Sequence, residues 1–303
     1  MQITKAIVPA AGRGTRLFPI TKAQPKEMLP LGPRPVIQGV AEELIAAGVT
    51  DILLITGESK RAIDDHFDPA SGLPPHDAPA ETRRYALDSA RARFYSLRQG
   101  APRGLGHAVA CGAHFASDEH VVVALGDCIL TSAEPLKRLV EQHRRHEAAI
   151  SIVVQRVSLQ ATARYGIIDP GEGLDEISFI MRDIVEKPGP DAAPSRYAVA
   201  ARYAFSPAIF DYLAGLEPGL GDEIQLTDAI RAMIADGHRA VAVPLMEGEH
   251  RLDVGNYASY GRAFIRTMLT DSVLGKDLRG YTAKLLTHLD DPAHPDPDLP
   301  EES

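Results

Sequence analysis

The segment with the clearest potential for chemistry is a glycine-rich turn with cations on either side. It reads Ala10-Ala11-Gly12-Arg13-Gly14-Thr15-Arg16 and comes directly after an apolar run that ends at Pro9. Glycines let backbone N–H groups approach an anion closely, and Arg16 and Lys26 add positive charge beside the turn. The segment therefore predicts a polyphosphate pocket in which cations neutralise a leaving pyrophosphate.

Two common phosphate-binding motifs are excluded for this turn. No Gly-Lys-Ser/Thr sequence follows it, so it is not a P-loop, and the third glycine of the dinucleotide fingerprint would fall at Leu17. Residues 1–34 contain six Lys or Arg residues and one acid, in a chain with a formal net charge of −9. A basic island in an acidic chain favours a small anionic ligand over a nucleic acid or an anionic membrane. A plain strand-to-helix connection with chance arginines is the structural alternative.

Charged residues at the ends of two other apolar runs could complete such a site. Asp127 closely follows the run 121–125, whose continuous apolar character predicts a strand buried on both faces. A carboxylate at the C-terminal end of a parallel strand lies where α/β sheets bind ligands. Glu186 and Lys187 close another apolar run. Taken singly, each residue could equally belong to a turn or to an exposed ion pair.

The elements that must position these residues alternate between extended and helical patterns. Residues 35–47 have apolar side chains three and four positions apart, with Pro35 at the start and Gly48 just past the end. Strands are expected at 5–9, 51–56, 93–97, 120–125, 149–157, 165–169, 177–186, 197–205 and 240–245, and further helices at 59–67 (Ser59 as N-cap), 106–116, 134–146, 206–213, 226–235 and 256–269. This order predicts an α/β fold with a mostly parallel central sheet and helices on both faces. The consecutive strands between 149 and 205 predict a small added β subdomain.

The chain of 303 residues is long enough to bury a core without disulfides or structural zinc. Its two cysteines, Cys111 and Cys128, form no CxxC pair and are expected to be buried small apolar residues. We expect one domain over residues 1–288, a mobile proline-rich loop at 68–81 and a disordered, acidic, proline-rich tail at 289–303. No apolar run suits a membrane helix or a signal peptide, which predicts a cytoplasmic protein without membrane or nucleic-acid partners.

Several blocks of the sequence resemble, in order, the sugar-nucleotide pyrophosphorylases, which join a sugar 1-phosphate to a nucleoside triphosphate. The resemblance is strongest to the bacterial uridylyltransferases that use UTP and glucose 1-phosphate, and it spans about residues 3 to 285. The blocks that carry it are 10–31, 46–50 (AAGVT), 59–67 (SKRAIDDHF), 98–99 (RQ), 104–109 (GLGHAV), 185–188 (VEKP) and 221–230 (GDEIQLTDAI).

This resemblance implies a Rossmann-like nucleotidyltransferase fold and a role for each candidate residue. The nucleotide is expected on Ala10, Ala11, Gly12, Gly14, Thr15, Gln99 and Gly104, and the sugar on Gly166 and Glu186. The amide of Gln99 offers both a donor and an acceptor to the uracil edge. The catalytic cations are expected to be Arg16, Lys26 and Lys187, and the Mg²⁺ ligands Asp127 and Asp253. Family members are usually dimers or tetramers, so a homodimer or homotetramer is expected, with a C-terminal helical oligomerisation segment at about 256–285.

The implied reaction is attack of a glucose 1-phosphate oxygen on the α-phosphorus of UTP, which releases pyrophosphate. Three alternatives stay open: a thymidylyltransferase that uses dTTP, a non-catalytic paralogue that binds nucleotide sugars, and a nicotinamide-dependent dehydrogenase with similar early β-α units. The chain departs from the family pattern at Gly126-Asp127-Cys128 and at 31–35. These departures leave the sugar preference and the subunit packing open.

Overall fold

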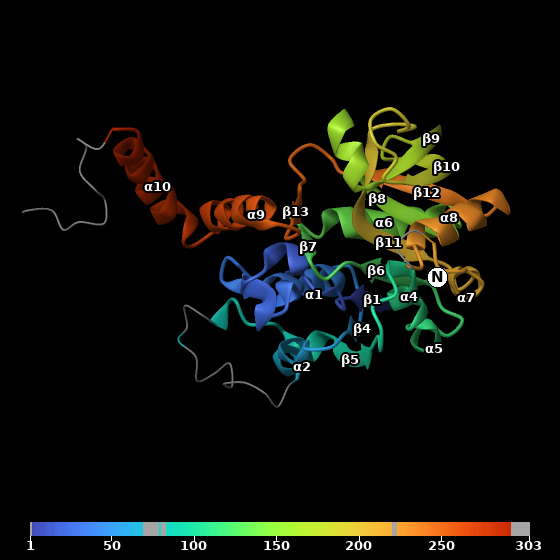
Figure 1. The fold of residues 1–303 in the computed structure, drawn as a ribbon, viewed down its shortest axis with the longest axis horizontal. Helices are drawn as coiled ribbons and strands as arrows, with labels where there is room; N and C mark the ends of the chain where they lie inside the picture. The colour runs from blue at the N-terminus through green and yellow to red at the C-terminus, as the bar shows by residue number, and fades with distance from the viewer. Residues whose placement is uncertain (1, 69–78, 80–82, 220–222, 292–303) are drawn as a thin grey trace, which may run out of the picture.

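The computed structural model describes residues 2–68, 79, 83–219 and 223–291. A single nine-stranded sheet lies at its centre, with helices around it (Figure 1). The loop expected at 68–81 falls almost entirely outside the described residues. From one edge to the other, the strands are β5 (Arg93–Arg98), β4 (Asp51–Thr56), β1 (Lys5–Pro9), β6 (Val121–Ala124), β11 (Tyr197–Phe205), β8 (Ile150–Arg156), β12 (Ala240–Pro244), β10 (Ser178–Glu186) and β9 (Gly166–Asp175).

Most strands of this sheet run in one direction. Strands β5, β4, β1 and β6 are parallel neighbours, and β12 is parallel to β8. Strand β11 is antiparallel to both β6 and β8, and β10 is antiparallel to both β12 and β9. The predicted mostly parallel α/β sheet is confirmed. The strands expected as an added β subdomain instead continue the same sheet, because β11 pairs directly with β6.

Alternate residues of the strands face two separate cores. On β1, Ala6 and Val8 pack into one core and Ile7 into the other, and all three are buried. Amphipathic helices cover each core with their apolar stripe, which confirms the prediction of helices on both faces. The first core is covered by α1 (Val36–Ala46), α2 (Arg61–Phe67) and α6 (Glu134–Arg145), and the second by α4 (Leu105–Ala110), α5 (Ala113–Ala116), α7 (Ile209–Ala214) and α8 (Leu226–Ala235).

Three helices differ from their predicted limits by more than one residue, and one of them is α7, which was expected at 206–213 but begins at Ile209. Ser59 has a left-handed φ of 63° and does not cap α2, which begins at Arg61. The helix expected at 106–116 is interrupted at Gly112, where a Cβ atom would collide with the side chain of Ile7. The left-handed conformation of Ser59 and the break between α4 and α5 are not visible in the apolar spacing of these segments.

Short elements that no periodicity reveals surround the candidate site. Strands β2 (Pro30–Leu31) and β3 (Arg34–Pro35) form one ribbon, and β7 (Cys128–Leu130) and β13 (Arg251–Asp253) form another. The proline-rich segment after the glycine turn forms three 3₁₀ turns: η1 (Thr15–Leu17), η2 (Ile20–Lys22) and η3 (Lys26–Met28). This segment is the stiff, shaped loop that its prolines predict.

The C-terminal helices leave the body of the protein. Helix α9 (Tyr257–Thr270) begins with a capping box between Asn256 and Ser259, and α10 (Gly275–Asp290) extends beyond it, away from the sheet (Figure 1). The tail expected from residue 289 therefore begins inside α10, and residues 292–303 lie outside the described part. In the part that the structure describes, no helix is long and apolar enough to cross a membrane.

Candidate functional site

Two adjoining hollows contain most of the residues that the sequence singles out. The glycine-turn hollow, about 540 Å³, is lined by Ala11, Gly12, Thr15, Lys26, Gln99 and Gly104 among others. The β10 hollow, about 430 Å³, is lined by Arg16, Gly166, Glu186, Lys187, Arg251 and Asp253 among others. Asp127 lines both hollows, so its carboxylate lies at their boundary. The glycine-turn hollow lies beyond the C-terminal ends of β1, β5 and β6, where parallel sheets bind ligands.

The glycine turn brings backbone close to a cation. Gly14 has a left-handed φ of 68°, and its carbonyl accepts a hydrogen bond from the Thr21 hydroxyl at 2.8 Å. A Cβ atom on Gly12 would lie 3.3 Å from the ammonium nitrogen of Lys26. Because Gly12 has no side chain, this ammonium faces the backbone of the turn, as an anion-binding loop requires.

Lys26 and Asp127 form the central ion pair of the site. Lys26 Nζ lies 2.5 Å from Asp127 Oδ2, across 101 positions of sequence. Burial alone would raise the pKa of Asp127, but Lys26 and Arg251 outweigh that effect and hold the pKa below its ordinary value. Burial likewise opposes the charge on Lys26, yet Asp127 and Glu27 raise its pKa overall. Both groups are therefore charged near neutral pH.

A second ion pair fixes the loop that carries Lys26. Lys60 Nζ lies 2.6 Å from Glu27 Oε2, and the two side chains are 6% and 1% exposed. Burial raises the pKa of Glu27, although Lys60 and Lys26 oppose the rise. Since a buried charge that loses its partner is costly, this pair holds η3 against the segment that follows β4.

The Gln99 amide is oriented by two acceptors. Its Nε2 atom donates to the Gly104 carbonyl at 3.2 Å and lies 2.8 Å from His107 Nδ1. These partners use both N–H groups of the amide, so its oxygen remains as an acceptor for a ligand. Gln99 is only 4% exposed, which makes this orientation firm. The contact of His107 with Gln99 links this histidine to the site, and no sequence spacing indicates this.

The two aspartates expected to share a metal lie on neighbouring backbone positions. In the ribbon of β7 and β13, Asp253 pairs with Cys128, the residue after Asp127. The Val254 N–H also donates to the Asp127 carbonyl at 3.1 Å. The two aspartates are more than a hundred residues apart in the sequence. This short ribbon brings them together, and both line the β10 hollow.

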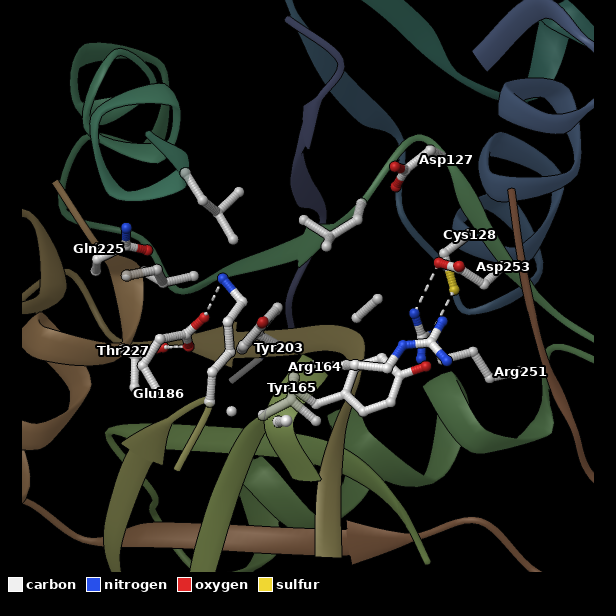
Figure 2. A pocket seen from close by; sticks show the side chains of 18 of the residues that line it. Asp127, Cys128, Arg164, Tyr165, Glu186, Tyr203, Gln225, Thr227, Arg251 and Asp253 are labelled. Atoms are coloured by element: carbon white, nitrogen blue, oxygen red, sulfur yellow. Dashed lines mark hydrogen bonds and ion pairs between the residues drawn. The ribbon is translucent and has the colours of Figure 1, made fainter. Parts of the chain in front are cut away.

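Arg251 is a site residue that the sequence analysis missed. Its Nη2 donates to Asp253 Oδ1 at 2.8 Å and its Nε lies 3.2 Å from Cys128 Sγ. Its guanidinium also stacks over the ring of Tyr165, 4.8 Å from the centroid (Figure 2). The only feature of the sequence that could have indicated Arg251 is its position two residues before Asp253. Arg251 therefore connects the loop before β9 to the carboxylates.

Glu186 and Lys187 lie together at the end of β10. Glu186 pairs with Gly166 of β9, and Lys187 Nζ lies 3.0 Å from Glu186 Oε1. Lys187 has a φ of 46°, uncommon for a residue with a side chain, and its N–H donates to the Tyr165 carbonyl at 3.1 Å. This backbone conformation directs the chain away from the strand at the residue expected to contact phosphate.

Asp127 and Asp253 are the carboxylates best placed to hold a metal. Among the described residues, no group of three or more His, Cys, Asp or Glu side chains could hold a metal ion. Mg²⁺ commonly binds one or two carboxylates and completes its shell with water and substrate phosphates. The two aspartates therefore fit Mg²⁺ bound together with a phosphate-bearing ligand.

The structure places nearly all predicted site residues on these two hollows. Ala10 is the main exception, because it is 1% exposed and its N–H donates to the Ile55 carbonyl. Gly14 lines neither of the two hollows. Its carbonyl accepts hydrogen bonds from the Thr21 hydroxyl and the Leu17 N–H, so it shapes the turn. The other nucleotide, sugar and metal candidates line one hollow or the other.

Comparisons with known proteins agree with this arrangement. A family model described as "Nucleotidyl transferase" matches residues 5–268. A UTP–glucose-1-phosphate uridylyltransferase of Bacillus subtilis is 42% identical over 286 residues, which cover 92% of this chain and 94% of that protein. A solved structure of a UTP-bound UGPase from Acinetobacter baumannii has a TM-score of 0.82 and 32% identity, covering 94% of this chain and all of that chain. A UDP-glucose pyrophosphorylase complexed with UDP-glucose has a TM-score of 0.78 and 34% identity, covering 87% and 97%.

Proposed function

The chain belongs to the nucleotidyl transferase family, and we propose that it forms UDP-glucose and pyrophosphate from UTP and glucose 1-phosphate. The observation that carries this proposal is the position of Asp127 between two hollows. One hollow has the glycine turn and Gln99, which suit a nucleoside triphosphate. The other has Glu186 and Lys187, which suit a sugar phosphate. The relatives named above act on, or were crystallised with, these ligands.

The uracil ring is bound in the glycine-turn hollow. Its N3–H group donates to the amide oxygen of Gln99, whose nitrogen is occupied by Gly104 and His107. Cytosine has no N3–H donor, so the same amide disfavours CTP. Thymine shares the N3–H of uracil, so Gln99 does not by itself exclude dTTP. The uridylyltransferase identity of the relatives favours UTP over the thymidylyltransferase alternative.

The reaction needs positioning and charge neutralisation more than covalent catalysis. Lys187 holds the glucose 1-phosphate so that a phosphate oxygen faces the α-phosphorus of UTP. A new oxygen–phosphorus bond forms there as the bond to the β-phosphate breaks. Lys26, in the glycine-turn hollow, stabilises the charge that accumulates on the leaving pyrophosphate, and Arg16 adds positive charge from the β10 hollow, which it lines. Glu186 accepts hydrogen bonds from sugar hydroxyls, and Gly166 leaves room for them.

Mg²⁺ is the proposed cofactor, with Asp127 and Asp253 as its protein ligands. When bound, it would neutralise phosphate charge at the boundary of the two hollows. Lys26 keeps Asp127 compensated in the free protein, and Arg251 does the same for Asp253. Chelation with EDTA should abolish turnover, and added Mg²⁺ should restore it.

The direct test is a matrix of nucleoside triphosphates against sugar 1-phosphates, read by released pyrophosphate. UTP with glucose 1-phosphate should give the highest kcat/KM, and chromatography should identify the product as UDP-glucose. Faster turnover of dTTP would favour the thymidylyltransferase alternative. No pyrophosphate release with any pair would favour a non-catalytic paralogue.

We also propose a homo-oligomer assembled through the C-terminal helices. Helix α10 leaves Leu286 and Leu289 55% and 65% exposed, and in the described residues only Gly275 of this helix is buried. Light scattering of the full chain and of a variant with both leucines changed to glutamate would test this role. Because both substrates are charged metabolites of the cytoplasm, we propose that the protein acts there.

A further inference from the structure

The carboxylate of Glu186 has a different partner on each oxygen. The hydroxyl of Thr227 donates to Oε2 at 2.7 Å (Figure 2). The ammonium of Lys187 lies 3.0 Å from Oε1. Both oxygens are therefore engaged in the free protein. Only one of them can be released to a ligand without loss of the geometry that points the carboxylate into the β10 hollow.

Thr227 is the fixed partner of the two. It is the second residue of α8, and its neighbours Leu226 and Ile230 are 2% and 1% exposed in the second core. The side chain is β-branched, so few rotamers are available to it. Its hydroxyl therefore reaches Glu186 from a helix that packing holds in place.

Lys187 is the exchangeable partner. Its side chain is 55% exposed, and an ion pair between such groups contributes little. The ammonium can leave Glu186 for a phosphate group at small cost, because a doubly charged phosphate is the better partner. Departure of Lys187 then frees Oε1, whereas Oε2 stays bonded to Thr227.

The backbone opposite Glu186 supports the same orientation. Gly166 pairs with Glu186 across β9 and β10, and a Cβ atom on Gly166 would lie 3.4 Å from Oε2. The Oε2 edge of the carboxylate therefore lies against the Gly166 position, at van der Waals distance from where a Cβ atom would be. Gly166 and Thr227 together define which edge faces the hollow.

We propose that Thr227 is a specificity-determining positioning residue, which holds Glu186 so that Oε1 meets one particular sugar hydroxyl when Lys187 moves to the sugar phosphate. The inference rests on the proposed function, because it takes Glu186 as the sugar-binding carboxylate. Epimeric sugars differ in the direction of one hydroxyl. A fixed acceptor distinguishes them through one strained or missing hydrogen bond, whereas a rotating carboxylate follows either hydroxyl.

The test compares Thr227→Val, Thr227→Ser and the wild type with glucose 1-phosphate and galactose 1-phosphate. Valine keeps the shape of threonine but removes the donor, so the KM for glucose 1-phosphate should rise at least about 10-fold, the lower value for one hydrogen bond to a charged group. The ratio of kcat/KM for the two sugars should fall at least about threefold. The KM for UTP should not change, and serine should restore both quantities. Thr270→Val, which removes a hydroxyl bonded within α9, is the matched control.

Several outcomes would overturn this inference. They are a Thr227→Val variant equal to the wild type in KM and sugar ratio, a Thr227→Ser variant as impaired as the valine variant, or an equal rise in the KM for UTP. Failure of the proposed function is distinct, because it would appear as absent turnover in the wild-type protein.

Discussion

Arg202 and Glu43 form a buried ion pair that holds the strand following Asp127. Arg202 Nη2 lies 2.8 Å from Glu43 Oε2 and also 2.8 Å from the Cys128 carbonyl. Glu43 Oε1 in turn accepts the N–H of Leu130 at 2.7 Å. The pair thus connects helix α1, strand β11 and both ends of β7. The backbone that presents Asp127, and through β13 Asp253, is fixed by one charged contact in the core.

Removing one partner of this pair should destabilise the protein strongly. Burial raises the pKa of Glu43, and Arg202 is the main group that opposes this rise. Arg202→Met leaves an uncompensated carboxylate, so the free energy of unfolding should fall by about 3–5 kcal/mol. Urea unfolding followed by circular dichroism measures this loss.

The double variant Arg202→Met with Glu43→Met is the control for that measurement. It removes both charges and should recover much of the lost stability, because replacing a whole buried pair by apolar groups is often nearly neutral. A double variant less stable than the single variant would show that the ion pair itself contributes to the free energy of unfolding. The loss in the single variant would then not come from the uncompensated Glu43 carboxylate.

The regular helices and strands of the fold were predictable because the spacing of their apolar residues indicates which positions are buried. Helix α1 has its predicted period, with Ile37, Val40 and Leu44 all buried, and β4 is buried at each position. The ribbon of β7 and β13 was not predictable, since three residues show no period. The left-handed φ of Ser59 and the break between α4 and α5 near Gly112 have no counterpart in the apolar spacing, so they were not predictable.

The residues of the candidate site likewise fall into a group that the sequence predicts and a group that it does not. Lys26, Asp127 and Glu186 belong to sequence blocks whose residue types reveal their chemistry. Arg251 and Thr227 act through partners far away in sequence, so their roles exist only once the chain is folded. The approach of Asp253 to Asp127 depends equally on the unpredicted ribbon.

Lys26 should be required for turnover rather than for folding. Its ammonium lies at the glycine turn and beside Asp127, where charge on a leaving pyrophosphate would accumulate. Lys26→Met should lower kcat by about 10²–10³-fold, as loss of a preorganised electrostatic group does. Pyrophosphate release under saturating substrates measures the effect, with circular dichroism to verify the fold. Lys137→Met, on the exposed face of α6, should retain full activity, and a Lys26 variant with similar activity would remove this lysine from the mechanism.

His107 should control the choice between uracil and cytosine. Its Nδ1 accepts from the Gln99 amide and so keeps the amide oxygen free for a ligand donor. In His107→Ala the amide loses this acceptor and can rotate, so the KM for UTP should rise about 5- to 10-fold. The kcat/KM ratio of UTP over CTP should fall with it. His114→Ala, an exposed histidine on α5, is the comparison, and an unaltered ratio in the His107 variant would mean that Gln99 is held by Gly104 alone.

Stability should fall in mild acid because of a buried histidine. His143 is fully buried on α6, with Nε2 at 2.8 Å from His120 Nδ1 and Nδ1 at 2.8 Å from Ser151 Oγ. Burial, and secondarily His120, lowers the pKa of His143 to about 3. In the unfolded chain the same group has its ordinary pKa near 6.5, so only the unfolded state gains this proton as the pH falls from about 6.5 towards 3.

Between pH 7 and 5.5 this difference should reduce the free energy of unfolding by roughly 1 kcal/mol. Burial also lowers the pKa of His120, which adds to the loss in the same direction. His143→Gln keeps a hydrogen-bonding side chain without the titration, so its stability should depend less on pH, whatever its absolute value. Urea unfolding at a series of pH values measures the slope, and His114→Gln should keep the wild-type slope. If the His143 variant kept that slope too, the acid sensitivity would have to come from other groups.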